Sequence, residues 1–455
     1  MSAIDPSTFD PPEEYLAIIR AVEAAGHEAW AVGGALRDCL YREMTGADDG
    51  ERSDWDVATS ARPHEILARF RRTVPLGIEH GTVGVLTPRG SVVEVTTFRR
   101  DVETDGRHAV VVFADTIDED LSRRDFTINA IAWRPETDDV RDPFHGRDDL
   151  RDGMLRAVGE PSERFREDYL RVLRGLRFAG RFDLEIERET REALVEAAAG
   201  LGRLSAERVR DELMKVLADP APSTALDLYA ECGALDEWLT ELEPLARHRP
   251  DWRSHLETVD ALRPHRPLLR LARLLTPVAE DPDGRGEAAE ALMERLRFSN
   301  AERRDVSRLV RWFLPFVSPM DSAAGTRSWL SQVDGAWMDL FRLHAAGARA
   351  ARDRRRRGWL VAAWRRVHET ILERPPLALS DLEIDGGDVL ALGVSAGPVV
   401  GLLLEELLEQ VLEDPGRNER ETLLAEARRL VEIGALAGPG SADRGAGGPG
   451  GRSRG

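Results

Sequence analysis

Cysteine is scarce in this sequence: Cys39 and Cys232 are the only two among 455 residues. Two cysteines cannot build the disulfide framework on which small secreted proteins depend. The chain also lacks the run of about 18 apolar residues that a membrane helix requires, because glutamates at helical spacing break even the stretch GPVVGLLLEELLEQVLE. The first residues, MSAIDPSTFDPPEEY, show no basic start followed by an apolar segment. We therefore expect a cytoplasmic protein with no membrane partner.

An excess of positive charge is also missing. The 63 basic residues are outnumbered by 82 acidic ones, which gives a formal net charge of -19 at pH 7. This balance argues against a protein that coats nucleic acid through bulk charge, although local basic patches could still bind RNA. The length favours two to four domains over a single hydrophobic core.

Secondary-structure signals divide the chain into an N-terminal mixed α/β part and a helical remainder. Apolar residues at helical spacing predict a helix over 13–25, and AWAV, which follows it, predicts a strand. The β-rich runs TVGVLT, VVEVTTF and AVVVFA alternate with turns up to about Trp133. From about Gly153 to Leu430, amphipathic helices follow one another between prolines and glycines.

Two carboxylates stand one residue apart in SDWDVATS. On a strand, Asp54 and Asp56 would project from one side while Trp55 and Val57 pack into the sheet. Two hard oxygen ligands beside a bound phosphate suit Mg²⁺ and nucleotidyl transfer. A solvated acidic turn gives the same short pattern, and for the pattern alone it is the more frequent explanation.

A glycine pair in VGGALRD favours the phosphate interpretation. Gly33 and Gly34, between a strand and a helix, would let backbone N–H groups approach a phosphate, with Arg37 one turn inside the helix. The alternative is a tight turn chosen for packing, with a surface pair of Arg37 and Asp38. Glu94 lies on the strand face opposite its valine neighbours and could supply a third carboxylate, although an ordinary edge-strand glutamate fits nearly as well.

Two arginine-rich segments lie further along. LSRRDFTINAIAW suggests a helix start that delivers one arginine to the site. In RFREDYLRVLRGLRFAGRF, apolar residues at helical spacing define a buried stripe, and Arg171 and Arg174 fall on the opposite face. Asp168 and Arg171, one turn apart and followed by Gly175, would read the edge of a flat base, since aspartate accepts from an exocyclic amine and arginine donates. The alternative is a salt-bridged exposed face.

These segments, VGGALRD, SDWDVATS, LSRRDFTINAIAW and REDYLRVLRGLRF, resemble in order and spacing the class II tRNA nucleotidyltransferase and poly(A) polymerase family, in particular its bacterial CCA-adding members. The resemblance implies an α+β protein: a polymerase-β-like nucleotidyltransferase head with a small mixed sheet, then all-α neck, body and tail. We expect the head at 1–150, a neck for base recognition and RNA binding at 151–220, the body at 221–375, the tail at 376–433, and a disordered Gly-rich end at 434–455.

The resemblance also implies a reaction: Mg²⁺-dependent, template-independent addition of C, C and A to tRNA from CTP and ATP. Asp54, Asp56 and Glu94 would be the catalytic carboxylates, with the metal on Asp54 and Asp56. The tRNA 3′-hydroxyl would attack the α-phosphate, and pyrophosphate would leave. The nucleotide would be bound by Gly33, Gly34, Arg37, Arg124, Asp168, Arg171, Arg174 and Arg177.

One departure from the family concerns the body. Many relatives carry a His-Asp metal pair there, where this sequence has Thr276 and Pro277. Neither residue can replace an imidazole or a carboxylate, so we expect no phosphohydrolase metal site, and His255 becomes a surface or packing residue. The basic run at 351–366 either follows RNA backbone or forms a solvated face.

Several alternatives remain open at this point. The enzyme could add only CC or only A, or could be a poly(A) polymerase, and the segment RRDVETDGRHAVVVFADTIDED, with Gly106, suits a mobile lever that switches base choice. A catalytically dead RNA-binding protein is disfavoured by the intact aspartates. A small-molecule nucleotidyltransferase is disfavoured by the long helical half.

Overall fold

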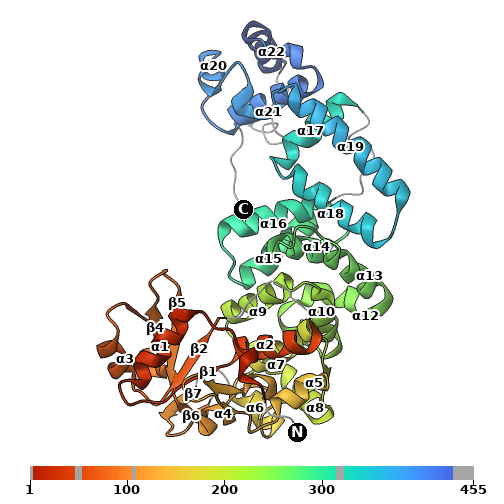
Figure 1. Cartoon of the computed structure of the whole chain (residues 1–455). Helices are drawn as coiled ribbons and strands as arrows, with labels where there is room; N and C mark the ends of the chain where they lie inside the picture. The colour runs from red at the N-terminus through yellow and green to blue at the C-terminus, as the bar shows by residue number, and fades with distance from the viewer. Residues whose placement is uncertain (1–3, 47–53, 105–108, 314–321, 434–455) are drawn as a thin grey trace, which may run out of the picture. The chain divides into compact units, whose positions relative to one another are not determined.

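The computed structural model describes residues 4–46, 54–104, 109–313 and 322–433. The chain forms two compact units, Met1–Val310 and Arg311–Gly455, which are described separately here (Figure 1). Among the described helices, none combines the length and the apolar character that crossing a bilayer requires. Residues 105–108, which include Gly106 of the predicted lever segment, and the Gly-rich end at 434–455 lie outside the described residues.

The first unit begins with a mixed sheet whose seven strands, counted over the described residues, have the order β3-β4-β5-β2-β1-β8-β9. Strands β2 and β5 run parallel, while the other neighbours are antiparallel. In chain order the strands are β1 (Ala29–Val32), β2 (Asp56–Thr59), β3 (Thr73–Pro75), β4 (Thr82–Leu86), β5 (Val92–Thr97), β8 (Ala132–Arg134) and β9 (Asp139–Arg141). A separate hairpin joins β6 (Arg99–Thr104) and β7 (Ala109–Phe113). The strands predicted from AWAV, TVGVLT, VVEVTTF and AVVVFA are thus confirmed.

Burial explains why these runs are strands. In β5, Val93 and Val95 are buried and Glu94 is exposed, which is the alternation of a strand covered on one face. Strand β1 is buried over its whole length and lies between β2 and β8. The head helices are α1 (Glu13–Glu23), α2 (Gly34–Thr45), α3 (Pro63–Arg69), α4 (Ile117–Ser122) and α5 (Gly146–Arg151).

The prediction that a helix starts in the segment LSRRDFTINAIAW is wrong. Only a single 3-10 turn, Thr127–Asn129, forms there, and the chain continues into β8. The cause is pairing with the segment after the head: Phe126 bridges Ala157, and the Val158 N–H donates to the Asp125 carbonyl oxygen at 3.2 Å. These bonds hold the backbone extended where its apolar content alone would allow a helix.

A helical region follows the sheet. Its helices are α6 (Pro161–Glu167), α7 (Leu170–Phe182), α8 (Arg188–Ala198), α9 (Ala206–Ala218), α10 (Pro222–Glu231), α11 (Leu235–Trp238), α12 (Glu243–Arg247), α13 (Arg249–Asp260), α14 (Pro267–Leu275), α15 (Pro282–Arg295) and α16 (Asn300–Trp312). Two short strands, β10 (Met154–Leu155) and β11 (Glu185–Ile186), pair in parallel. Of the predicted stripe Tyr169, Val172, Leu173 and Leu176, helix α7 buries the last three, whereas Tyr169 immediately precedes the helix and is half-buried. Helix α7 contacts α9 and α10.

The second unit is also helical where it is described. It contains α17 (Ala323–Val333), α18 (Trp337–Ala350), α19 (Arg354–Leu372), α20 (Gly386–Ala391), α21 (Pro398–Glu413) and α22 (Arg420–Glu432). Leucines of α21 and α22, together with Leu382, Ile384 and Val389, form its apolar core. The α+β architecture predicted from the sequence, a mixed sheet followed by helices, is confirmed.

Candidate active site

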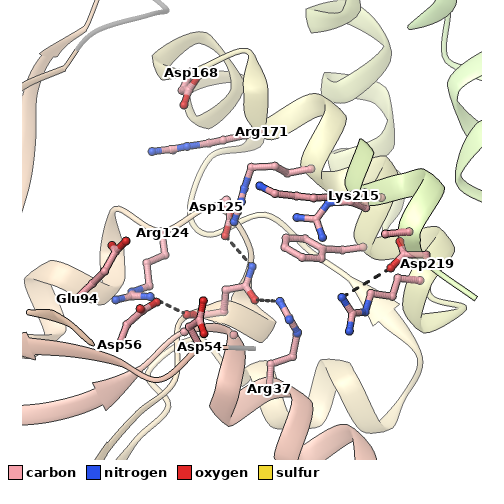
Figure 2. Close-up of a pocket in the computed structure, with 18 of the residues that line it drawn as sticks. Arg37, Asp54, Asp56, Glu94, Arg124, Asp125, Asp168, Arg171, Lys215 and Asp219 are labelled. Carbon is pink, nitrogen blue, oxygen red and sulfur yellow. Dashed lines mark hydrogen bonds and ion pairs between the residues drawn. The ribbon is translucent and has the colours of Figure 1, made fainter. Parts of the chain in front are cut away.

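Three carboxylates lie at one edge of the head sheet. Asp56 begins β2, Asp54 precedes it by two residues, and Glu94 lies on β5. Because β2 and β5 pair in parallel with Val57 opposite Val95, Asp56 and Glu94 occupy equivalent places on neighbouring strands. All three line one pocket, which is the arrangement expected from period-two spacing (Figure 2).

The Asp56 carboxyl has a pKa raised to about 7. Burial is the main cause, because it disfavours the charged form. Repulsion from Glu94 and Asp54 adds to the effect, and Arg124 opposes it. Over the described residues, no three histidine, cysteine, aspartate or glutamate side chains stand close enough together to ligate a metal.

Gly33 stands where the strand β1 turns into α2. Its φ of +81° lies in the region that favours glycine, and a Cβ there would lie 3.3 Å from Arg124 Nη1 and 3.7 Å from Asp56 Oδ2. The glycine therefore lets the arginine and the aspartate approach the turn closely. Gly34 is the first residue of α2.

Arg37 is buried beside the pocket. Its guanidinium donates to Asp38 Oδ1 at 2.8 and 2.6 Å and to Asn129 Oδ1 at 2.7 Å. It also lies 4.8 Å from the centre of the Phe178 ring. Arg37 and Asp38 do pair, as the alternative interpretation had it, but in the interior and not on the surface.

The LSRRD segment adds the charged side chains of Arg123, Arg124 and Asp125 to the lining of the pocket. Arg124 is held by Asp120, at 3.2 Å, and by the carbonyl oxygen of Asn129, at 3.4 Å. The next residue, Asp125, is buried and accepts from Arg174 Nε at 2.8 Å. Burial acts to raise the pKa of Asp125, but Arg174 and the Asn129 amide outweigh it and hold the pKa well below its usual range.

Asp168 and Arg171 do not lie on one continuous helix, so that prediction is corrected. The backbone is extended at Asp168, between α6 and α7, since φ is -153° and ψ is 107°. One Asp168 oxygen accepts from Arg208 at 2.7 Å and the other from the Leu170 N–H at 3.0 Å. Arg171 donates to Glu167 at 2.7 Å and to the Arg123 carbonyl oxygen at 3.1 Å. Both side chains are oriented by other residues and not by each other.

Gly175 does not provide a place for a base. A Cβ there would lie 2.7 Å from the Phe126 ring, so the ring that approaches the helix at this point belongs to the protein itself. Asp168 and Arg171, the residues predicted to read the base, lie just before α7 and in its first turn. In Figure 2 these two side chains lie above Asp125, whereas Asp54, Asp56 and Glu94 lie below and to the left.

The pocket has a volume of about 760 Å³ and is lined by every predicted site residue: Gly33, Gly34, Arg37, Asp54, Asp56, Glu94, Arg124, Asp168, Arg171, Arg174 and Arg177. The sequence reasoning missed further lining residues: Arg123, Asp125, Asn129, Phe178, Arg181, Lys215, Ala218 and Asp219. The last three belong to α9 or follow it directly, far from the motifs in sequence. A volume of this size accommodates a nucleoside triphosphate.

In the body region, Thr276 and His255 each bond to a backbone carbonyl oxygen of α14. Thr276 follows α14 and its hydroxyl donates to the Arg273 carbonyl oxygen at 2.9 Å. His255 Nε2 lies 3.1 Å from the Leu274 carbonyl oxygen. Burial, with a smaller contribution from Arg273, lowers the pKa of His255 to about 3, so the ring packs as a neutral group.

Comparison with known proteins agrees with the geometry. Residues 29–156 match the family described as the poly(A) polymerase head domain, and residues 183–245 match the probable RNA and SrmB-binding site of polymerase A. The head sheet, the carboxylates and the arginine-rich pocket thus define a nucleotidyltransferase of the poly(A) polymerase class.

Relatives that match over most of the chain show which family of nucleotidyltransferases it belongs to. The CCA-adding enzyme of Leuconostoc mesenteroides is 31% identical over 92% of this chain and 98% of its own, and that of Geobacillus stearothermophilus is 32% identical over 91% and 96%. A crystal structure of the Bacillus stearothermophilus CCA-adding enzyme in complex with CTP matches with a TM-score of 0.71 at 29% identity, over 94% of this chain and 99% of that one. The chain belongs to the CCA-adding enzyme family.

Proposed function

We propose that this pocket adds C, C and A, taken from CTP and ATP, to the 3′ end of tRNA without a nucleic-acid template. The observation that carries the proposal is the convergence of motifs that are distant in sequence. A Cβ at Gly33 would lie 3.3 Å from Arg124 Nη1 and 3.7 Å from Asp56 Oδ2, and the proposed base-reading pair Asp168 and Arg171 lines the same pocket. The whole-length relatives that bear this name support the same reaction.

The carboxylate edge fits Mg²⁺. Burial raises the pKa of Asp56, repulsion from Glu94 and Asp54 adds to this effect, and a divalent cation would offset that repulsion. We assign the metal to Asp54 and Asp56, with Glu94 as a third carboxylate. When bound, Mg²⁺ would supply a Lewis acid that polarises the attacking hydroxyl and the α-phosphate.

The protein side chains then bind and orient the substrates. Asp54 and Asp56 define where the 3′-hydroxyl of tRNA meets the α-phosphate, and pyrophosphate leaves as the new bond forms. Arg124, held by Asp120, contacts the triphosphate or the sugar. Arg174 and Arg177 neutralise phosphate charge, and Arg37 adds positive charge from beneath them. Gly33 and Gly34 let the backbone approach the phosphates.

Asp168 and Arg171 select the base. An aspartate oxygen accepts from the exocyclic amine that cytosine and adenine both carry, and uracil lacks this amine. Arg208 and the Leu170 N–H hold the carboxylate, while Glu167 holds the guanidinium, so the hydrogen-bonding pattern is offered before a nucleotide arrives.

The remaining helices suit tRNA as the partner. Residues 183–245 match a probable RNA-binding region, and the first turn of α19 presents exposed arginines, Arg354 to Arg357, that could follow RNA backbone. We place the enzyme in the cytoplasm, where its tRNA substrates are processed.

A nucleotide-addition assay tests the function. Purified protein is incubated with Mg²⁺ and tRNA that ends before CCA, with CTP, ATP or both, and the products are resolved at single-nucleotide length. We expect two additions with CTP and a third when ATP is also present. Addition of only C, or of only A to tRNA ending in CC, would indicate a partial enzyme.

Two further experiments test the other candidate functions and the metal assignment. Tailing of unrelated RNA with ATP alone would identify a poly(A) polymerase. Unchanged CTP incorporation by Asp54→Ala would show that the metal assignment is wrong. The chain's basic residue Arg253, which pairs with Asp227 on the surface, offers a control at Arg253→Ala, for which we expect full activity.

A further inference from the structure

Lys215 is the only lysine among the 63 basic residues of the chain. It lies near the end of α9 and lines the active-site pocket. Its side chain is 55% exposed, compared with 31% for Arg174, the next most exposed cation of the pocket. The one side-chain ammonium group of the chain is therefore the most exposed cationic side chain of this pocket.

A buried glutamate holds Lys215 in place. Glu212, one turn earlier on α9, accepts from Lys215 Nζ at 2.8 Å through one oxygen and from Arg177 Nε at 2.8 Å through the other. Burial acts to raise the pKa of Glu212, but Arg177, Arg174 and Lys215 lower it, so the glutamate is anionic. An ammonium has three N–H donors, and the Glu212 bond uses one of them, which leaves donors for a ligand.

The surroundings of Lys215 are suited to phosphate. In Figure 2, Lys215 and Asp219 lie on the side of the pocket away from Glu94 and Asp56. Phe178 also lines the pocket, and the guanidinium groups of Arg174 and Arg177 lie 5.1 and 4.5 Å from the centre of its ring. The pocket thus carries Asp54, Asp56 and Glu94 at one end and, at the other, several cations beside one lining carboxylate, Asp219, which pairs with Arg181 at 3.7 Å.

The distance between the carboxylates and the cations determines how a nucleotide would be oriented in the pocket. If the α-phosphate lies at the carboxylates and the base at Asp168 and Arg171, the β- and γ-phosphates need a third, cationic region. The cationic region around Arg177, Arg181 and Lys215 lies in the same pocket as Gly33, Gly34 and Arg124, to which the phosphates are assigned above. A compact ammonium on a flexible stem can follow the phosphates as they separate from the nucleotide, whereas a planar guanidinium needs a fixed geometry.

We infer that Lys215 binds the terminal phosphates of the incoming nucleotide and retains the pyrophosphate that leaves, an inference that rests on the nucleotidyltransferase function proposed above. As the bond from the tRNA 3′-oxygen to the α-phosphorus forms, the bond from that phosphorus to the bridging oxygen breaks. The electron pair of the broken bond stays on pyrophosphate. Lys215 offsets the charge that develops there, and Glu212 is its positioning residue.

Steady-state kinetics with Lys215→Met test this role. One charge-assisted hydrogen bond contributes about 1.5–3 kcal/mol, so we expect roughly a 10- to 100-fold rise in the KM for CTP and in the inhibition constant for pyrophosphate. The KM for tRNA and the preference for C over U should not change. Arg210→Met is the matched control, since Arg210 lies on α9 outside the pocket and pairs with Asp211.

The outcomes separate this inference from the proposed function. A wild-type protein that adds nothing to tRNA contradicts the function itself. With an active wild type, a Lys215→Met variant that raises the KM for tRNA but leaves pyrophosphate inhibition unchanged would place Lys215 on the RNA and overturn the inference. A variant with wild-type constants for all substrates would also overturn it.

A second measurement does not depend on a folded variant. Because Lys215 is the only lysine, acetylation of wild-type protein with N-hydroxysuccinimidyl acetate modifies one ε-amine, which peptide mass spectrometry separates from the N-terminus. We expect pyrophosphate with Mg²⁺ to slow this acetylation strongly, and tRNA alone to leave it unchanged. Protection by tRNA alone, without protection by pyrophosphate, overturns the inference.

Discussion

The substitution Gly33→Ala tests whether the turn before α2 is shaped for the site or only for the fold. At φ +81° a residue with a Cβ is strained, at a cost of order 1–3 kcal/mol. The new Cβ would also stand 3.3 Å from Arg124 Nη1, which is tighter than ordinary contact, so the arginine must move by a few tenths of an ångström. Asp120 and the Asn129 carbonyl oxygen hold Arg124, so the shift disturbs its bonds.

Gly26→Ala provides a matched control. Gly26 has φ +91° and nothing within 4 Å of the position where a Cβ would lie, so it carries the backbone strain without the contact. We expect similar losses of thermal stability in both variants, a few °C at most. Only Gly33→Ala should lose catalytic rate, by roughly 10-fold or more, because a misplacement of about 1 Å at an active site costs about 100-fold.

The assay is single-turnover transfer of CMP to tRNA lacking CCA, at saturating CTP, together with a thermal melt of each variant. Saturation separates the rate of the chemical step from nucleotide binding. If the two alanine variants react at the same rate, the close approach of Arg124 and Asp56 to the turn has no part in catalysis. The reasoning from the glycine geometry would then be refuted.

Three further predictions follow from the same structure. Glu94→Gln should raise the Mg²⁺ concentration needed for half-maximal activity severalfold, and an unchanged metal titration would remove Glu94 from the metal site. Asp168→Ala should let UTP compete with CTP while the KM for tRNA stays constant, and unchanged incorporation ratios would contradict its base-reading role. His255→Gln should make stability less sensitive to acid. The folded pKa of about 3 lies below the unfolded value of about 6.5, so the unfolded state binds the extra proton and stability falls by about 1.4 kcal/mol per pH unit below 6.5. Equal urea midpoint shifts between pH 7 and pH 5 in variant and wild type would contradict this.

Local patterns indicated the carboxylate edge of the site, but the pattern of Asp54 and Asp56 alone is more often a solvated acidic turn, and the later motifs favoured the metal site. The alternation of Asp54 and Asp56 with apolar neighbours predicts their common face, because side chains on a strand alternate between its faces. The turn at Gly33 is predicted in the same way, since a glycine pair between a strand and a helix indicates an unusual backbone. These features depend on residues close together in the chain.

Features that depend on distant packing could not be predicted. The break at Asp168 is held by Arg208 from α9, and the space beside Gly175 is filled by Phe126 from the head. Lys215 and its neighbours reach the pocket because α9 packs against α7, which no local pattern around them reveals. The extended backbone at Phe126 likewise results from its bridge to Ala157.

The same long-range contacts bear on the proposal that side chains stand in for a template. If Asp168 and Arg171 read the base, as we propose, the two groups must keep a defined spacing, and each is held by another residue. Arg208, on α9, holds the aspartate, and Glu167, on α6, holds the arginine. The spacing of the reading groups is therefore set by the packing of α6, α7 and α9. A small shift among these helices would change which hydrogen-bonding pattern is offered, so a site that accepts cytosine and then adenine can change its selectivity without exchanging any reading residue.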